Sequence, residues 1–313
     1  MGELAIIIPA YKHDFLESTL DSLCKQTKDD FHVYIGDDNS PHNLEKIVAK
    51  YRHKLKITYK KFEQNLGSSS LVDQWKRCIN MSVEPWIWLF SDDDIAEPYC
   101  VAEFYNIVNK NSDFYKFKSK LIDSDGRNIE LSATDITNHI KEPITAEVFI
   151  NLRLLQGTLR SCAIEYIFSR KIYNKMGIVD FPLAWGSDDA TWINYAAANE
   201  GITLMDAYVQ WRMSGKNIST VLDNKQSNEK KIDASCKLIA WLIEFSKERD
   251  INLSNNLLLK RLTFQIAPLH VNLSLREFQK AVKKSGIVID NARIIYFYLQ
   301  IKLRYYKRKI ISR

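Results

Sequence analysis

The sequence predicts an α/β fold in which a mostly parallel sheet is flanked by helices and followed by an all-helical C-terminal extension. Strand and helix patterns alternate through the first half of the 313 residues, an order that favours parallel strands joined by crossover helices. From about Asn224 onward only helical patterns remain. We therefore expect an α/β domain at 1–224 and a helical region at 225–313, separated by a polar junction.

The first half begins with a continuous apolar run at 4–9, which is typical of a strand buried on both faces. Asp14 is expected to cap the next helix, which runs to about Gln26 and carries its apolar residues on one face. The further elements expected here are a strand at 31–36, a helix at 44–51, a strand at 55–59, a helix at 71–79 and a strand at 85–90.

Less regular sequence follows at 119–143, where no element is expected. Strand and helix patterns return at 165–176, 190–198 and 203–211. The C-terminal helices are expected at 226–249, 255–267, 274–284 and 289–311, and the last of them is rich in basic and aromatic residues.

The composition excludes several classes of protein. With 46% apolar and 12% aromatic residues the chain can form a real core, which excludes global disorder. The net charge of +6 is concentrated at the C-terminus, so a nucleic-acid partner is not indicated. The five cysteines are odd in number and far apart, which favours a reducing compartment over a disulfide frame or structural zinc. Because the sequence shows no signal peptide and no apolar run near 18 residues, we expect a cytoplasmic protein.

Three consecutive carboxylates, Asp92, Asp93 and Asp94, follow the apolar strand at 85–90. Like charges this close repel one another, so something cationic is expected to share the site. A hard divalent ion takes oxygen ligands and often bridges a carboxylate to a substrate phosphate. The structural alternative is an acidic turn that caps the next helix.

Two other strand ends carry residues suited to a nucleotide. The first strand ends in Pro9, Ala10 and Tyr11, and the second is closed by a polar turn that contains Asp38. A carboxylate there can accept a hydrogen bond from a base or a ribose hydroxyl, and a tyrosine ring can lie against the base. Alone, each segment is better explained as a turn. Together with the three aspartates they describe one pocket at the carboxyl edge of the sheet, where open α/β sheets bind ligands.

The stretches at 6–11, 34–40 and 91–94 together resemble the motifs of the family 2 glycosyltransferases, and the resemblance covers about 4–220. It implies the GT-A fold and a nucleotide-sugar donor, most often a UDP-sugar. The turn at 9–11 is then expected beside the donor.

The same resemblance implies roles for single acidic residues. Asp38 is expected on the uracil or ribose of the donor. Aligned backwards from Pro98, Asp92 takes the ribose place, and Asp93 and Asp94 are the expected ligands of a Mg²⁺ or Mn²⁺ ion on the diphosphate.

Basic and small residues complete the expected donor site. Asn65 and Gly67 belong to a turn that lies near the nucleotide in the family, and Arg77 is expected to contact phosphate or base. The alternative for Arg77 is a solvated arginine on a helix. The segment at 211–219 is similar to the loop that closes over the diphosphate, where Arg212 and Lys216 can supply positive charge.

An acidic pair, Asp188 and Asp189, stands between two tryptophans at the start of an expected helix. Inverting sugar transfer needs a carboxylate beside the acceptor hydroxyl, opposite the leaving diphosphate. The resemblance assigns this general base to Asp189, with Asp188 as the alternative. Aromatic neighbours raise the basicity of such a carboxylate, and the helix N-terminus favours its anion. The structural alternative is helix capping by Ser187 and Asp188.

The sequence therefore predicts an inverting, metal-dependent glycosyltransferase that acts on a glycan or lipid-linked glycan acceptor in bacterial surface-polysaccharide synthesis. One alternative is a sugar nucleotidyltransferase, but such enzymes carry a glycine-rich basic turn where this chain has 9–11. Another is an inactive nucleotide-sugar-binding protein, which is disfavoured because both acidic motifs are intact.

The last 22 residues, 292–313, contain seven basic residues and no acid, interleaved with apolar and aromatic residues. This pattern predicts binding to an anionic membrane surface, which would place the protein on the inner face of the cell membrane. The alternative is a docked helix whose basic residues are solvated.

Overall fold

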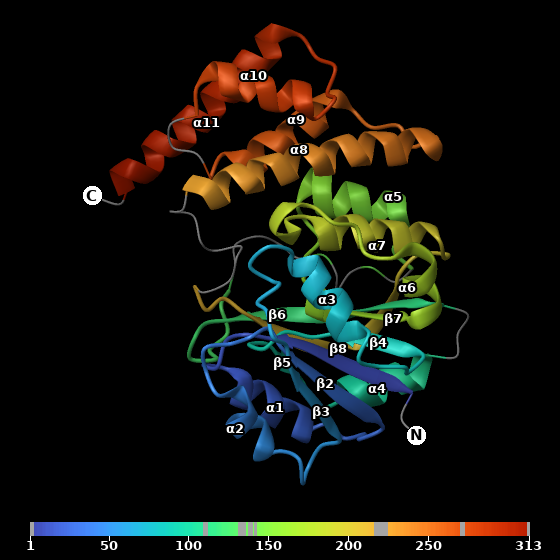
Figure 1. The fold of residues 1–313 in the computed structure, drawn as a ribbon. Coiled ribbons are helices and arrows are strands. Elements are labelled where there is room, and N and C mark those ends of the chain that lie inside the picture. The colour runs from blue at the N-terminus through green and yellow to red at the C-terminus, as the bar shows by residue number, and fades with distance from the viewer. Residues whose placement is uncertain are drawn as a thin grey trace.

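The computed structural model describes residues 3–108, 112–130, 136, 140, 143–215, 225–269 and 273–311, with side chains to 303 in the last helix. In these residues an eight-stranded sheet has the order β3-β2-β1-β4-β7-β6-β8-β5, with helices on both faces (Figure 1). The predicted α/β class with a helical C-terminal extension is confirmed.

The first four strands form the parallel half of the sheet. They are β1 (Leu4–Ala10), β2 (Phe31–Asp37), β3 (Ile57–Lys61) and β4 (Trp86–Leu89). Parallel pairing joins β1 to both β2 and β4, and joins β2 to β3. The carboxyl ends of these strands therefore lie at one edge of the sheet, which brings the segments after β1, β2 and β4 together.

The other four strands make the sheet mixed, although most of its strand pairs are parallel, as predicted. They are β5 (Ile95–Ala96), β6 (Phe114–Ile122), β7 (Tyr166–Ser169) and β8 (Thr203–Arg212). β7 runs antiparallel to β4 and β6, and β5 runs antiparallel to β8, whereas β6 and β8 are parallel. The sheet changes direction at β7, directly beside the strand that carries the three aspartates.

β6 was not predicted, and its last residues fall in the stretch at 119–143 where no element was expected. Lysines alternate along this strand, which gives it a polar appearance in the sequence. Lys116, however, is fully buried and forms an ion pair with the equally buried Glu165. A buried charge is tolerated when it is paired, and this pair keeps the lysine inside the sheet.

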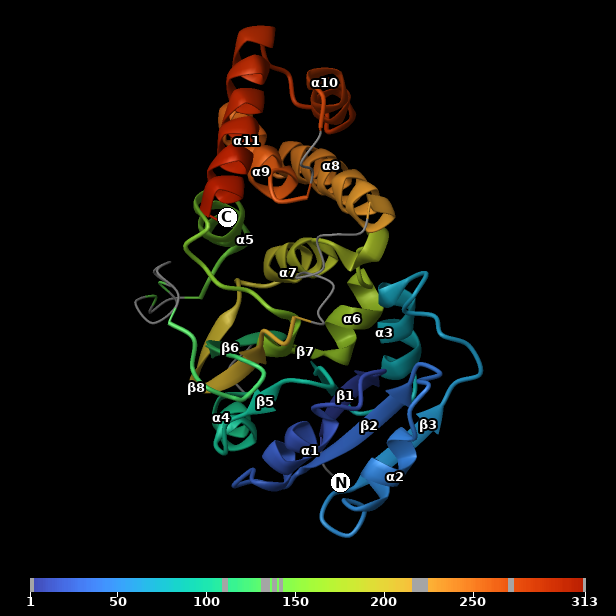
Figure 2. The same cartoon turned by 90° about the vertical axis from the view of Figure 1, so that its left-hand side faces the viewer.

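The two faces of the sheet are covered by different helices, as Figures 1 and 2 show. Ile6 and Ile8 of β1 belong to one apolar cluster, whereas Ala5 and Ile7 belong to the other. On the Ile6 side lie α1 (Leu16–Cys24), α2 (Leu44–Ala49) and α4 (Cys100–Ile107), and on the Ile7 side lie α3 (Leu71–Ile79), α6 (Arg170–Met176) and α7 (Ser187–Ala197).

One predicted helix cap is wrong. The N-cap of α1 is Phe15, with no side-chain hydrogen bond to the cap, so Asp14 does not take that role.

The C-terminal helices form a layer above α5 (Ala146–Phe149) and α7 (Figure 1). They are α8 (Lys225–Glu248), α9 (Asn255–Ile266), α10 (Leu275–Lys284) and α11 (Asn291–Ile311), close to the predicted ranges. Their apolar residues join the cluster on the Ile7 side of the sheet. The predicted boundary at 224/225 stays a prediction, since 216–224 lie outside the described residues. No helix among the described residues is long and apolar enough to cross a membrane.

Candidate active site

The turn after β1 is tied to the aspartate cluster after β4. Asp92 Oδ2 accepts hydrogen bonds from the backbone N–H groups of Tyr11, at 2.8 Å, and of Lys12, at 2.7 Å. The Tyr11 ring itself is exposed at this edge. Pro9 and Ala10 pair with the last two residues of β2, so they form the floor of the turn. The predicted residues of these two segments are thus brought together.

Lys12 is a site residue that the sequence analysis missed. Its ammonium group donates to Asp93 Oδ2 and lies 3.2 Å from Asp92 Oδ1. Burial works to lower the pKa of Lys12, but the charges of the two aspartates outweigh it and the pKa is raised. Desolvation, followed by the charge of Asp92, raises the pKa of Asp93. The expected cation therefore comes, in this structure, from the chain itself.

Asp94 lies deeper than its two neighbours. One carboxylate oxygen accepts a hydrogen bond from the backbone N–H of Arg212 at 2.8 Å, and Oδ2 has no partner among the described residues. Desolvation and the charge of Asp93 raise the pKa of Asp94 to about 8. A buried oxygen without a partner is costly, which suits a position that completes its bonding with a ligand.

Arg212, at the end of β8, joins the aspartate segment to the segment after β6. Its guanidinium donates to the carbonyl oxygens of Asp93 at 2.7 Å, Asp123 at 3.0 Å and Ser124 at 3.2 Å. Its side chain is buried, so in this conformation it stabilises the loop. Its predicted contact with phosphate stays a prediction, and Lys216 lies outside the described residues.

The aspartate cluster fits a hard divalent ion with few protein ligands. No group of three or more His, Cys, Asp or Glu residues suited to a metal is found in the described part of the chain. Asp92 and Asp93 nevertheless both contact one cation, the ammonium of Lys12. Oδ2 of the adjacent Asp94 is buried and has no hydrogen-bond partner among the described residues. Mg²⁺ is usually held by one or two carboxylates together with substrate phosphates, and this all-oxygen donor set meets that requirement.

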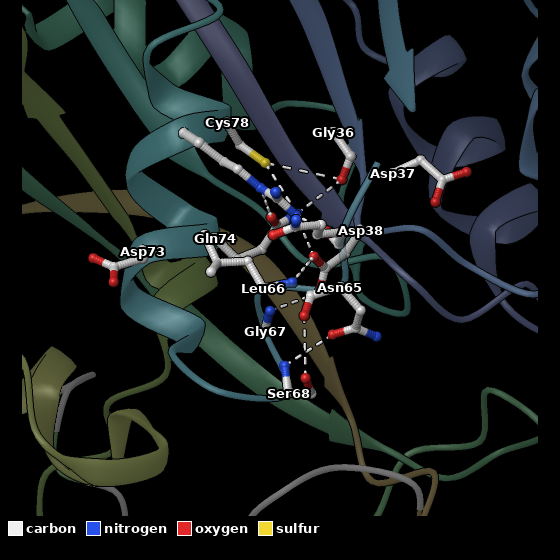
Figure 3. Close-up of polar contacts among 12 residues, drawn as sticks. Gly36, Asp37, Asp38, Asn65, Leu66, Gly67, Ser68, Asp73, Gln74 and Cys78 are labelled. Carbon is white, nitrogen blue, oxygen red and sulfur yellow. Dashed lines mark hydrogen bonds and ion pairs between the residues drawn. The ribbon is translucent and has the colours of Figure 1, made fainter. Parts of the chain in front are cut away.

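Asp38 organises the second part of the site (Figure 3). Its two oxygens accept hydrogen bonds from the backbone N–H groups of Leu66, at 2.7 Å, and Gly67, at 2.8 Å. A Cβ on Gly67 would lie 2.6 Å from Asp38 Oδ2, so only glycine allows this approach. Asn65 shapes the same turn by accepting the Ser68 N–H at 2.9 Å.

Arg77, on α3, is held in place on this side of the site. Its guanidinium donates to Asp38 Oδ1 and to the Gln64 carbonyl, and it stacks on the Phe62 ring at 3.9 Å. The alternative of a freely solvated Arg77 is therefore wrong. Asp37, by contrast, points away from Asp38 and accepts from Tyr59 and Ser40 (Figure 3).

The acid pair lies at the start of α7, as predicted. The N-cap is Gly186 in a left-handed conformation, with φ of 81°. A Cβ there would lie 2.8 Å from Leu238 of α8, so glycine lets the C-terminal helices approach this helix start. Ser187 Oγ accepts the Phe181 N–H at 2.8 Å and does not cap the helix, so that alternative is wrong for Ser187.

Two arginines from distant elements face the acid pair. Arg153, in the π-helix Ile150–Gln156, donates from Nε to Asp189 Oδ1 at 2.9 Å. Arg261 of α9 places a guanidinium nitrogen 4.0 Å from Asp189 Oδ2. No motif in the sequence points to either arginine, because a π-helix and a helix of the C-terminal extension supply them.

Burial and neighbouring charges shift the pKa values of Asp188 and Arg261. Desolvation and the charge of Asp189 raise the pKa of Asp188 to about 7, and the charge of Arg153 opposes this rise. Desolvation and the charge of Arg153 lower the pKa of Arg261 to about 10. A carboxyl group that titrates near neutral pH is suited to accept a proton during catalysis.

Cys162 is a thiol that feels the charges of both acidic clusters. Desolvation and then the charge of Glu165 raise the pKa of its thiol, Arg153 opposes the rise, and the charges of Asp94 and Asp188 add to it. The segment around Cys162 is fixed beneath β4 by a hydrogen bond of 2.7 Å from Trp88 Nε1 to the Ile164 carbonyl.

Comparisons with known proteins show the family of this chain. The family model described as "Glycosyl transferase family 2" matches residues 5–177. The uncharacterized glycosyltransferase RT0329 of Rickettsia typhi is 26% identical over 196 residues, 61% of this chain and 58% of that protein. The poly(ribitol-phosphate) beta-N-acetylglucosaminyltransferase TarP of Staphylococcus aureus is 22% identical over 179 residues, 56% of this chain and 54% of that protein. The chain thus spans little more than half the length of these relatives.

A solved structure shows the same fold. The crystal structure of residues 1–349 of S. aureus TarS, in complex with UDP-GlcNAc, superposes with a TM-score of 0.59 and 16% identity. The match covers 97% of this chain and 91% of that one, so it includes the C-terminal helices as well as the sheet.

Proposed function

The chain belongs to glycosyl transferase family 2, and on that premise we propose that it is an inverting, metal-dependent glycosyltransferase. It moves a sugar from a UDP-sugar to a glycan or lipid-linked glycan in bacterial surface-polysaccharide synthesis. One observation carries this proposal: after β4, Asp92 and Asp93 converge on one cation and the adjacent buried Asp94 has an oxygen without a partner among the described residues, which suits a metal-bound diphosphate.

The nucleoside end of the donor is assigned to the Asp38 side of the site. The exposed Tyr11 ring lies against the base, and Asp38, Asn65, Gly67 and Arg77 surround base and ribose. Both Asp38 oxygens already accept hydrogen bonds within the chain. Oδ1 also accepts from Arg77, but Oδ2 has a second lone pair, so Asp38 can accept a further bond from the nucleoside without losing the turn.

The diphosphate is assigned to the aspartate segment. Asp92 holds the turn after β1 beside the ribose, and Asp93 and Asp94 are the proposed ligands of Mg²⁺ or Mn²⁺. Such an ion, when bound, neutralises the charge that develops on the leaving diphosphate. The buried Arg212 keeps the segment in place through the Asp93 carbonyl and the Asp94 carboxylate.

The acceptor side is assigned to the start of α7. The acceptor hydroxyl oxygen attacks the anomeric carbon as its proton passes to Asp189, or to Asp188 in the alternative assignment. The bond from the anomeric carbon to the β-phosphate oxygen breaks, and UDP leaves with the electron pair, so the configuration inverts. Arg153 and Arg261 hold Asp189 in position for this step.

The TarP name and the TarS complex support the class of donor that we propose. TarP is named as an N-acetylglucosaminyltransferase, and TarS was solved with UDP-GlcNAc. We therefore place a UDP-hexose or UDP-N-acetylhexosamine first among the donors to test.

The last helix supports a peripheral location on the inner face of the membrane. Ile295, Tyr296, Leu299 and Leu303 follow one face of α11 and are each 41–58% exposed, whereas Ile301 on the opposite face is buried. Basic residues surround this exposed apolar stripe in the sequence. Flotation with anionic liposomes should decrease on deletion of 292–313 and with added salt, and flotation that responds to neither would remove the membrane from the proposal.

A donor screen tests the proposed activity. The protein is incubated with Mn²⁺ and a panel of UDP-, GDP-, ADP- and dTDP-sugars, and both thermal stabilisation and release of free nucleotide are measured. We expect stabilisation by UDP-sugars and slow release of UDP. Synthesis of a nucleotide sugar from a triphosphate would indicate a nucleotidyltransferase, and stabilisation without any turnover, with or without acceptor glycans, would indicate a binding protein.

A further inference from the structure

Lys12 occupies the position between two carboxylates that a bound cation would be expected to take. Its ammonium contacts both Asp93 and Asp92, and its own backbone N–H is one of the two that hold Asp92 Oδ2. The residue therefore contacts the cluster through its side chain and, independently, through its backbone.

The side chain of Lys12 can leave this position, whereas the carboxylates cannot. The lysine side chain is 22% exposed, but those of Asp92 and Asp93 are only 6% and 5% exposed. A lysine carries a compact charge on a flexible stem, and it makes no bidentate contact that would lock its geometry. The hydrogen bond from its backbone N–H to Asp92 keeps the Lys12 backbone in place while the side chain changes its conformation.

Electrostatics gives the ammonium a reason to move when a donor binds. Next to a divalent ion on Asp93, the ammonium would meet a like charge at short range, which is unfavourable. The diphosphate of the donor offers several anionic oxygens, and lysine is a common phosphate ligand. The orphan oxygen of the buried Asp94 is a second, independent sign that this cluster completes its bonding with a ligand.

We propose that Lys12 exchanges partners during donor binding: its ammonium leaves Asp92 and Asp93 as the metal-bound donor enters, and then binds the donor diphosphate. This inference rests on the proposed function. Without donor, Lys12 keeps the acidic cluster neutralised and competes with free metal ions. With donor, it contributes to diphosphate affinity. One side chain thus makes metal binding depend on the nucleotide.

Two binding measurements on Lys12→Met test the exchange, because it predicts effects of opposite sign. Mn²⁺ binding to the nucleotide-free protein, followed by electron paramagnetic resonance, should become tighter, since the competing ammonium is gone. UDP binding at saturating Mn²⁺, followed by calorimetry, should become weaker by about ten-fold or more, the loss expected for one charge-assisted hydrogen bond.

Two further variants serve as controls. Lys50→Met removes a surface lysine whose side chain is 57% exposed and pairs with Glu17, not with the aspartate cluster, so it should change neither affinity. Lys12→Arg keeps the charge, so its Mn²⁺ affinity without nucleotide should stay near that of the wild type, which also keeps the test usable if Lys12→Met does not fold.

The outcomes separate this inference from the proposed function. A wild-type protein that binds neither UDP nor Mn²⁺ would refute the proposed function itself. If the wild type binds both, but Lys12→Met shows Mn²⁺ affinity that is unchanged or weaker, or UDP affinity that is unchanged, the exchange is wrong. Tighter Mn²⁺ binding by Lys12→Arg would also overturn it, because charge would then not be the cause.

Discussion

The two acidic clusters of the site are neutralised in different ways. Asp92 and Asp93 share one lysine, which comes from the adjacent turn after β1 and is partly exposed. Asp189 faces two arginines, which come from a π-helix and from a C-terminal helix. A single flexible ammonium can be exchanged for another cation, whereas guanidinium groups fixed by separate elements hold a carboxylate in one place. The difference suggests that the first cluster is built to exchange its cation and the second to keep its geometry.

The largest effect is expected at the acid pair. Asp189→Asn keeps the shape of the side chain and removes the proton acceptor, so turnover should decrease by about 10²–10⁴. UDP affinity should stay within a few-fold of wild type, because the base faces the acceptor. The same change at Asp188 is the matched control and should reduce turnover less. Normal turnover in Asp189→Asn with none in Asp188→Asn would move the base by one residue, and normal turnover in both would refute the mechanism.

Removal of metal should affect the other cluster. In EDTA, UDP affinity measured by calorimetry should decrease by about two orders of magnitude, since the diphosphate and the carboxylates then repel one another across a short distance. Restoring Mn²⁺ should restore binding. Equal affinities with and without EDTA would mean that Lys12 alone neutralises the diphosphate, and the ion would have to be removed from the account.

Asp38→Ala tests the part of the donor site that is proposed to bind the base and ribose. Loss of this carboxylate removes a charged hydrogen-bond acceptor and frees the 65–67 turn, which should cost about 1.5–3 kcal/mol of UDP binding. A sugar phosphate without a base should lose less. If the affinities for UDP and for the sugar phosphate decrease equally in parallel titrations, Asp38 only supports the turn and does not bind the nucleoside.

A smaller effect is expected on the pH dependence of turnover. Desolvation and Asp189 raise the pKa of Asp188 to about 7, and Arg153 acts against this rise. Because Asp188 adjoins the proposed base and is itself the alternative base, turnover should rise with pH through about 7 as Asp188 loses its proton. In Arg153→Met the opposing cation is gone, so the rise should move to higher pH by about one unit. An unchanged profile would show that Arg153 does not act on the acid pair.

The sequence predicted those parts of the site that follow strand ends. Asp38, Asp92 and the turn at 9–11 lie where parallel strands finish, and the parallel pairing of β1 with β2 and β4 is enough to bring them to one edge. The close approach of Gly67 to Asp38, by contrast, was not predicted, because their contact joins two segments far apart in the sequence.

The cations of the site could not be predicted in the same way. Lys12 was missed because its partners lie 80 and 81 residues away, and only the structure places its ammonium between them. Arg153 and Arg261 have no periodic or motif signal, because their roles depend on how a π-helix and α9 meet the start of α7. β6 was missed for a related reason, since the partner of its buried Lys116 is the distant Glu165.

The central claim is that one cluster binds the donor and the other activates the acceptor. Calorimetric titration of UDP with Mn²⁺ into Asp93→Ala and Asp189→Asn, side by side with wild type, tests it most directly. We predict that Asp93→Ala loses most of its UDP affinity while Asp189→Asn binds UDP within a few-fold of wild type. Loss of UDP binding in Asp189→Asn, or wild-type binding in Asp93→Ala, would contradict this division of the site.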